Sequence, residues 1–146
     1  MTASFSFIHA ADLHLDSPFR GMSYLEELAG GEFKHVFQRL RDCTFIALTR
    51  LVDLCLEKKV DFLLLAGDLF DVANRSLRAQ LRFREEMQRL AEAGISVFVI
   101  SGNHDPADGW RADLEYPATV HFFSEREVEK RPVIKGGREV AQIYGI

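Results

Sequence analysis

Phe62-Leu63-Leu64-Leu65-Ala66-Gly67-Asp68 is an apolar run that ends in a glycine and a carboxylate. Two other stretches repeat this pattern: the run 5–11 leads into Asp12-Leu13-His14, and the run 95–100 precedes Gly102-Asn103-His104-Asp105. Each apolar run predicts a buried strand, and the helical patterns between them predict a βαβαβ order with right-handed parallel crossovers. The sequence therefore predicts an α/β fold that brings polar groups to one edge of a parallel sheet.

The segments between and after these strands complete the expected fold. Apolar residues recur at helical spacing from about Phe33 to Lys58. A second helix is expected over about 75–93, with Asn74 as its cap and Gly94 just beyond its end. A short helix is expected around 24–28. After Asp105 we expect short strands at 119–123, 128–134 and 139–144, the last two joined by a hairpin turn at Gly136-Gly137.

Composition limits the classes of protein that this chain can belong to. Its 146 residues, 47% of them hydrophobic, suffice for one domain with a real core. With 18 basic and 22 acidic residues the net charge is −4, so tight autonomous nucleic-acid binding is not expected. Nucleic acid could still be a substrate if a metal or a partner supplied positive charge.

The cysteines and the N-terminal residues help to predict the cellular compartment of the protein. Cys43 and Cys55 fall on one predicted helix about 18 Å apart, too far for a disulfide, which is typical of a reducing compartment. The first residues lack the basic region of a signal peptide, and no apolar stretch has the length of a membrane span. We therefore expect a soluble cytoplasmic protein without a membrane partner.

The residues at the ends of the predicted strands suit a metal centre. Asp12 and His14 lie two residues apart, so a turn at the strand end lets both bind one ion. Asp68 could bridge that ion to a second one, and Asn103 could offer the second its amide oxygen. This mixture of donors suits manganese, iron or zinc. Two such ions about 3.5–4 Å apart clamp a phosphoryl oxygen and activate a water molecule.

Two further residues of the third motif are candidates for catalysis. His104, next to the ligand candidate Asn103, is placed to donate a proton or a hydrogen bond to a phosphate oxygen. Asp105 could orient that imidazole. Gly-Asp after a strand is by itself often only a helix cap, and Asp12-Leu13-His14 alone would leave the question open. Three such motifs in order favour the metal site.

The other polar residues near these motifs have simpler interpretations. Asp16 either supports the ligands or caps a helix, and capping is favoured. His9, inside the first strand, is interpreted as a packed, hydrogen-bonded core residue, and His121 as a structural residue of a later strand. Four arginines lie near one side of the second helix, at positions 75, 78, 82 and 89. A solvated face with Arg82–Glu86 and Glu85–Arg89 pairs is favoured over a phosphate-binding stripe.

At Asp12, His14, Asp68, Asn103 and His104 the sequence resembles the calcineurin-like metallophosphoesterases, whose signature reads D-x-H, G-D and G-N-H-D/E. The opening Phe7-Ile8-His9-Ala10-Ala11-Asp12-Leu13-His14-Leu15-Asp16-Ser17-Pro18-Phe19 is similar to that of bacterial DNA-repair exonucleases of the YhaO type, relatives of the SbcD nuclease subunit. The resemblance implies a four-layer αββα sandwich and two divalent ions, usually Mn²⁺, with Fe or Zn as alternatives. It also implies a homodimer that works with an SbcC-like ATPase coiled-coil partner.

One departure from this family changes what is expected of residues 1–146. The family completes its site with a later His and a G-H-x-H motif, and nothing after Asp105 supplies them. The chain therefore resembles the N-terminal portion of the metallophosphoesterase domain, truncated before those motifs, with its second metal site incomplete. We expect it to be inactive alone, and an uncovered apolar sheet face would promote its self-association.

Taken together, these features predict a metal-dependent phosphodiesterase, an exonuclease or endonuclease subunit that acts on DNA in DNA repair. The metal motifs do not specify the substrate, so a phosphatase or a small-molecule phosphodiesterase is an alternative. A second alternative is a non-catalytic module in which the metal edge only scaffolds a partner. A G-H-x-H motif downstream of Ile146 would favour the enzyme.

Overall fold

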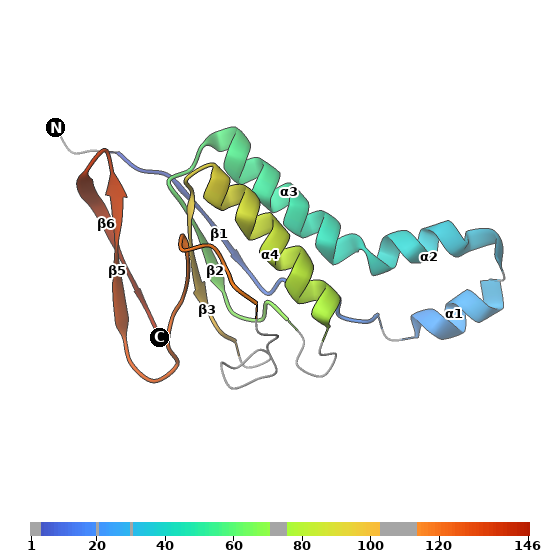
Figure 1. The fold of residues 1–146 in the computed structure, drawn as a ribbon. Helices are drawn as coiled ribbons and strands as arrows, with labels where there is room; N and C mark the ends of the chain where they lie inside the picture. Colours follow the sequence, from blue (N-terminus) through green and yellow to red (C-terminus); the bar gives the residue numbers. More distant parts are fainter. Residues whose placement is uncertain (1–3, 20, 30, 71–75, 103–113) are drawn as a thin grey trace.

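The fold is a parallel sheet covered by helices on one face and by a hairpin on the other, as seen in a computed structural model that describes residues 4–19, 21–29, 31–70, 76–102 and 114–146 (Figure 1). The strands are β1 Phe7–Ala11, β2 Phe62–Ala66, β3 Ser96–Ile100, β4 Val120–Phe122, β5 Glu129–Lys135 and β6 Arg138–Gly145. The helices are α1 Met22–Ala29, η1 Gly31–Phe33 (a 3₁₀ turn), α2 Lys34–Arg41, α3 Cys43–Lys58 and α4 Leu77–Glu92.

The four-stranded sheet has the order β1-β2-β3-β4, and all its strands are parallel. Phe62 is paired with Phe7 on one side and with Ser96 on the other, and this register continues to Ala66. The strands β2 and β3 are therefore central, which explains why their sequences are apolar on both faces. The predicted α/β fold with a βαβαβ core followed by short strands is confirmed.

Two apolar clusters hold the layers together, one on each face of the sheet. The helices α3 and α4 cover one face through a core whose largest fully buried side chains include Phe83, Leu48, Leu63, Leu65 and Met87. On the other face the β5–β6 hairpin packs through a second cluster of Phe62, Phe98, Phe123 and Val133. The described residues thus form three layers, α, β and β, as expected for the N-terminal part of an αββα sandwich.

The long helix expected over 33–58 is in fact two helices, and this prediction was wrong at one point. The break lies at Asp42, between α2 and α3. The Asp42 carboxylate accepts hydrogen bonds from Gln38 and Arg78. A short polar side chain that bonds outside the helical pattern favours a helix end over a helix interior. The helices α1 and α2 consequently extend away from the sheet (Figure 1).

The first strand was expected to be covered on both faces, and this expectation was also wrong. Phe7, His9 and Ala11 are exposed on one face of β1, whereas Ile8 and Ala10 are half-buried against the helices. The interpretation of His9 as a packed core residue therefore fails. The reason is that β1 is the edge strand of the sheet. The Phe7 side chain is 50% exposed and stacks on the rings of Phe5 and Phe62.

The ends of α4 and of the hairpin follow the expected chemistry with one correction. The residue that caps α4 is Ser76 and not Asn74, since the Ser76 hydroxyl accepts the Ala79 amide at 3.0 Å; Asn74 lies outside the described residues. Gly94 follows the helix with φ +72°, and the turn Gly136-Gly137 has φ +57° and +76°. Both of these predictions are confirmed.

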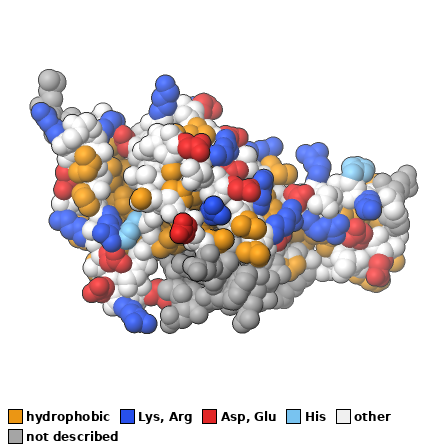
Figure 2. Space-filling view, viewed as in Figure 1, with side chains coloured by type: hydrophobic (Ala, Val, Ile, Leu, Met, Phe, Trp, Pro, Cys, Tyr) orange, Lys and Arg blue, Asp and Glu red, His pale blue; other side chains and the backbone are white. Residues whose placement is uncertain are grey.

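Three arginines of α4 form ion pairs, as a solvated helix face predicts. The pairs are Arg78 with Asp16 and Asp42, Arg82 with Glu85, and Arg89 with Glu86 and Asp53. The partners on α4 itself are three residues away and not four as expected. Figure 2 accordingly shows basic and acidic side chains interspersed over this face. Arg75 lies outside the described residues.

Two other expectations concern the free thiols and the membrane. Cys43 and Cys55 both lie on α3 and are unpaired, and burial raises the pKa of the Cys55 thiol. Among the described residues no helix combines the length and the apolar character that a membrane span requires.

The helix–sheet core depends on Phe83, which is fully buried on α4 and contacts the rings of Phe70, Tyr116 and Phe122. We expect Phe83→Ala to lower the free energy of unfolding by about 3–5 kcal/mol, because it removes buried area and leaves a cavity. The matched control is Leu81→Ala on the exposed side of the same helix, which should cost about 1 kcal/mol or less. Urea unfolding curves measure both, and equal costs would contradict this account of the core.

Candidate metal centre

Three of the predicted ligands meet at the carboxyl ends of β1 and β2. Each of Asp12, His14 and Asp68 offers one ligand atom, and these atoms all lie within 4.8 Å of one another. The His14 Nε2 atom is 3.9 Å from Asp68 Oδ2. Asp12 is exposed, whereas His14 and Asp68 are half-buried, so the site is open to solvent on one side.

Backbone pairing between the two strands continues beyond their ends and sets this geometry. The His14 amide donates to the Asp68 carbonyl at 2.9 Å, and the Leu15 amide donates to the Leu69 carbonyl at 2.9 Å. Leu15 is only 1% exposed, which anchors the loop in the core. The loops that carry the predicted ligands are thus bonded to each other through their backbones.

The three predicted ligands have a left-handed backbone conformation that few residue types tolerate. The φ angles are +54° at Asp12, +42° at His14 and +46° at Asp68. Outside glycine, this region is adopted mainly by Asn, Asp and His, and it costs other residues roughly 1–2 kcal/mol. Asp and His are therefore suited both to metal binding and to the positive φ angles of these turns.

A close approach of two loops explains the glycine of the third motif. The Gly67 amide donates to the Ile100 carbonyl at 2.9 Å, which brings the ends of β2 and β3 together. A Cβ atom added to Gly102 would lie less than 3.0 Å from both the carboxylate and the backbone nitrogen of Asp68. The contact with Asp68 therefore requires glycine at position 102.

The donor set of the described residues fits a divalent transition metal. One imidazole nitrogen and two carboxylates suit manganese, iron or zinc better than calcium, which takes oxygen ligands. Asp12, His14 and Asp68 would hold such an ion. The predicted ligand Asn103 and the predicted catalytic residues His104 and Asp105 lie outside the described residues, so their roles stay predictions.

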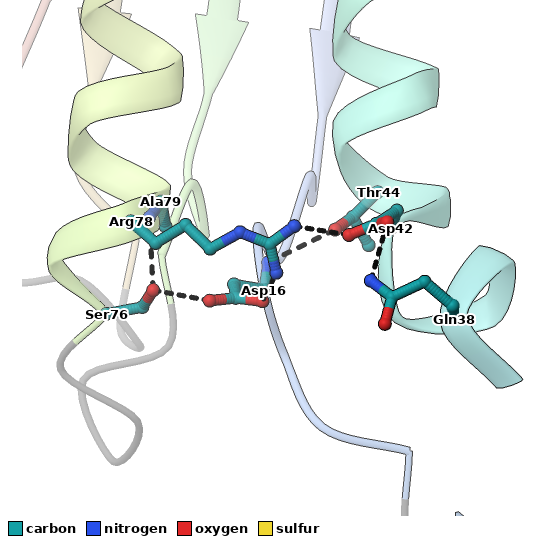
Figure 3. Close-up of polar contacts among 7 residues, drawn as sticks. All are labelled: Asp16, Gln38, Asp42, Thr44, Ser76, Arg78 and Ala79. Carbon is teal, nitrogen blue, oxygen red and sulfur yellow. Dashed lines mark hydrogen bonds and ion pairs between the residues drawn. The ribbon is translucent and has the colours of Figure 1, made fainter. Parts of the chain in front are cut away.

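Beside the ligands lies a polar cluster that sequence analysis missed. The Asp16 carboxylate accepts the Ser76 hydroxyl at 2.5 Å and pairs with Arg78, and the Asp16 amide donates to the Thr44 hydroxyl at 3.1 Å (Figure 3). The Asp16 carboxylate thus binds the side chain of Ser76, which itself caps α4, and the interpretation of Asp16 as a capping residue stays a prediction. A signal was present in the continued alternation Asp12-x-His14-x-Asp16, but its partners lie far along the chain.

Comparison with known proteins agrees with this geometry. Residues 5–143 match the family model of the calcineurin-like phosphoesterases. The chain belongs to the calcineurin-like phosphoesterase family. It is 48% identical over 145 residues to a protein of Bacillus subtilis described as "Uncharacterized metallophosphoesterase YhaO", a match that covers 99% of this chain and 34% of the relative.

More distant members of the family are described as proteins of DNA metabolism. A subunit of the nuclease SbcCD of Bacillus subtilis is 30% identical over 102 residues, which cover 69% of this chain and 22% of the relative. The "DNA double-strand break repair protein Mre11" of Sulfolobus acidocaldarius is 39% identical over 99 residues, which cover 67% of this chain and 25% of the relative. The chain thus spans at most about a third of the length of these curated relatives.

The contact of Gly102 with Asp68 can be tested by adding one methyl group. We expect Gly102→Ala to displace the Asp68 carboxylate and to weaken Mn²⁺ binding by at least about tenfold, because a moved ligand cannot share an ion with His14. Calorimetric titration measures the affinity. The control is Gly31→Ala, where the new Cβ atom meets nothing within 4 Å. Unchanged Mn²⁺ affinity in Gly102→Ala would contradict the proposed position of Asp68.

Proposed function

We propose that this chain is the N-terminal part of a two-metal phosphodiesterase domain that acts on DNA in repair. The observation that supports the proposal most directly is the convergence of Asp12, His14 and Asp68 at one sheet edge, in a chain of the calcineurin-like phosphoesterase family. A pair of divalent ions bound there would stabilise the negative charge of a phosphoryl oxygen and would lower the pKa of a water molecule. We propose Mn²⁺ as the ion, with Fe and Zn as alternatives.

In this proposal each residue of the site has its own role. Asp12 and His14 hold the first ion, Asp68 is shared between the two sites, and Asn103 serves the second. His104 donates a proton or a hydrogen bond to a phosphate oxygen, and Asp105 orients its ring. The second site stays incomplete within residues 1–146, and the missing ligands would come from the later His and the G-H-x-H motif of the family.

The proposed substrate and partners come from the relatives. Those described as Mre11 and as part of the nuclease SbcCD are named for double-strand break repair and for nuclease activity. We therefore propose DNA as the substrate, a homodimer as the assembly and an SbcC-like ATPase as the partner. The unpaired cysteines Cys43 and Cys55 agree with a reducing compartment, and we propose the cytoplasm.

Hydrolysis by the complete protein tests the reaction. We expect Mn²⁺-dependent cleavage of a generic phosphodiester and of linear DNA, and Asp68→Asn should lower the rate by more than the roughly 10–100-fold that loss of a supporting residue costs. The control is Asp53→Asn, at an exposed ion pair of α3. Cleavage of phosphomonoesters alone would favour the phosphatase. Mn²⁺ binding without any hydrolysis would favour the non-catalytic module.

A second substitution separates chemistry from metal binding. In the complete protein, His104→Ala should reduce turnover by roughly 10²–10⁴-fold and leave the content of bound Mn²⁺ nearly unchanged, because its proposed contact is with the reacting phosphate. Steady-state rates and elemental analysis of the same sample provide the two measurements. A parallel loss of metal and activity would instead make His104 a ligand.

A further inference from the structure

Asp16 has a left-handed backbone conformation. Its φ angle is +62°, and it follows His14, at +42°, by two residues. The Ser17 amide donates to the His14 carbonyl at 3.1 Å, so the chain turns tightly between these positions. Asp and His tolerate positive φ at low cost, so they allow this turn without dictating it, and the side-chain contacts of Asp16 select it.

Three of the residues that contact Asp16 lie at the N-terminal ends of α3 and α4. Ser76 and Arg78 of the α4 N-terminus contact its carboxylate at 2.5 Å and 3.5 Å. Thr44, in the first turn of α3, accepts its amide at 3.1 Å. Figure 3 shows Asp16 between the N-terminal ends of these helices. Both helices pack on the sheet, so they offer rigid anchors for the loop.

The guanidinium that faces Asp16 is itself held in place. Arg78 also pairs with Asp42, and its guanidinium carbon lies 4.6 Å from the centre of the Phe45 ring. Hydrogen bonds from Gln38 and Arg78 keep the pKa of Asp42 below its ordinary value, so the charge of this partner is maintained. Arg78 is thus a fixed cation against which the Asp16 carboxylate can be placed.

This arrangement joins the two loops that carry the ligands. Asp16 continues the loop of Asp12 and His14, whereas Ser76 begins α4, the helix that follows the loop of Asp68. The hydrogen bond between Ser76 and Asp16 joins the start of α4 to the loop that carries His14. We propose that Asp16 is a positioning residue of the metal centre, whose carboxylate, bound by Ser76 and Arg78, maintains the left-handed turn that directs His14 toward Asp68. This role rests on the proposed function.

Three substitutions in the complete protein separate the effect of losing the Asp16 carboxylate from the effect of straining the Asp16 backbone. Asp16→Gly adopts φ +62° without strain and removes the carboxylate. Asp16→Asn tolerates the same φ and can still accept the Ser76 hydroxyl, but it loses the charge that faces Arg78. Asp16→Ala loses the carboxylate and also strains the backbone. A positioning role predicts that Mn²⁺ affinity falls from the wild-type protein through Asp16→Asn and Asp16→Gly to Asp16→Ala. The affinity of Asp16→Gly should be about 10–100-fold below that of the wild-type protein.

Amide exchange provides a second measurement that needs no metal. The His14 amide, which donates to Asp68, should exchange at least about tenfold faster in Asp16→Gly, because its loop is released. The Val97 amide, which donates to Thr119 across the sheet, should not change. Glu85→Gln is the matched control, since it breaks the Arg82–Glu85 ion pair on the same helix and should alter neither quantity.

The outcomes distinguish positioning from a merely structural contact. If Asp16→Gly lowered the unfolding midpoint but retained wild-type Mn²⁺ affinity and His14 exchange, the proposal would be overturned. A wild-type protein that binds Mn²⁺ and hydrolyses nothing would refute the proposed function, and the affinity series would still decide the role of Asp16. A wild-type protein that binds neither Mn²⁺ nor Fe²⁺ nor Zn²⁺ would also refute the function, and the exchange rate of the His14 amide would then decide the role of Asp16.

Discussion

The arrangement of the metal centre depends on the parallel pairing of β1 with β2, which continues past the point where both strands end. The hydrogen bonds from His14 to Asp68 and from Leu15 to Leu69 keep the two exit loops in register. If this pairing stopped at Ala11 and Ala66, the ligands would emerge on independent loops, and ordering them would cost conformational entropy when an ion binds. The backbone pairing thus brings Asp12, His14 and Asp68 together at one edge of the sheet.

The layers around the sheet explain why the pairing can be so regular. The helices α3 and α4 cover one face, and the β5–β6 hairpin covers part of the other. The central strand β2 is enclosed on both faces, with Phe62 and Leu63 almost fully buried on opposite sides. Close packing gives this strand no room to shift its register, and its carboxyl end is the fixed point from which Asp68 projects.

Sequence alone predicted the features that local patterns determine. Apolar runs located the central strands, and the polar motifs after them located Asp12, His14 and Asp68, because parallel strands must share one carboxyl edge. What it missed depends on contacts distant in sequence. The break at Asp42 reflects Arg78 of another helix, the exposure of His9 reflects the edge position of β1, and the partners of Asp16 lie on α3 and α4. The periodicity of apolar residues along the sequence does not predict such contacts.

The left-handed turns at the ligands have a consequence for how the site can diverge among relatives. Asp, Asn, His and Gly are the residues that occupy positive φ at low cost, and three of them are also metal ligands or their neutral counterparts. An exchange of Asp12 or His14 within this group would change the charge and hardness of the donors while the loop keeps its path. Cys or Glu would have to overcome an unfavourable backbone as well. The backbone conformation therefore limits the residues that can replace Asp12 or His14 at low cost to Asp, Asn, His and Gly.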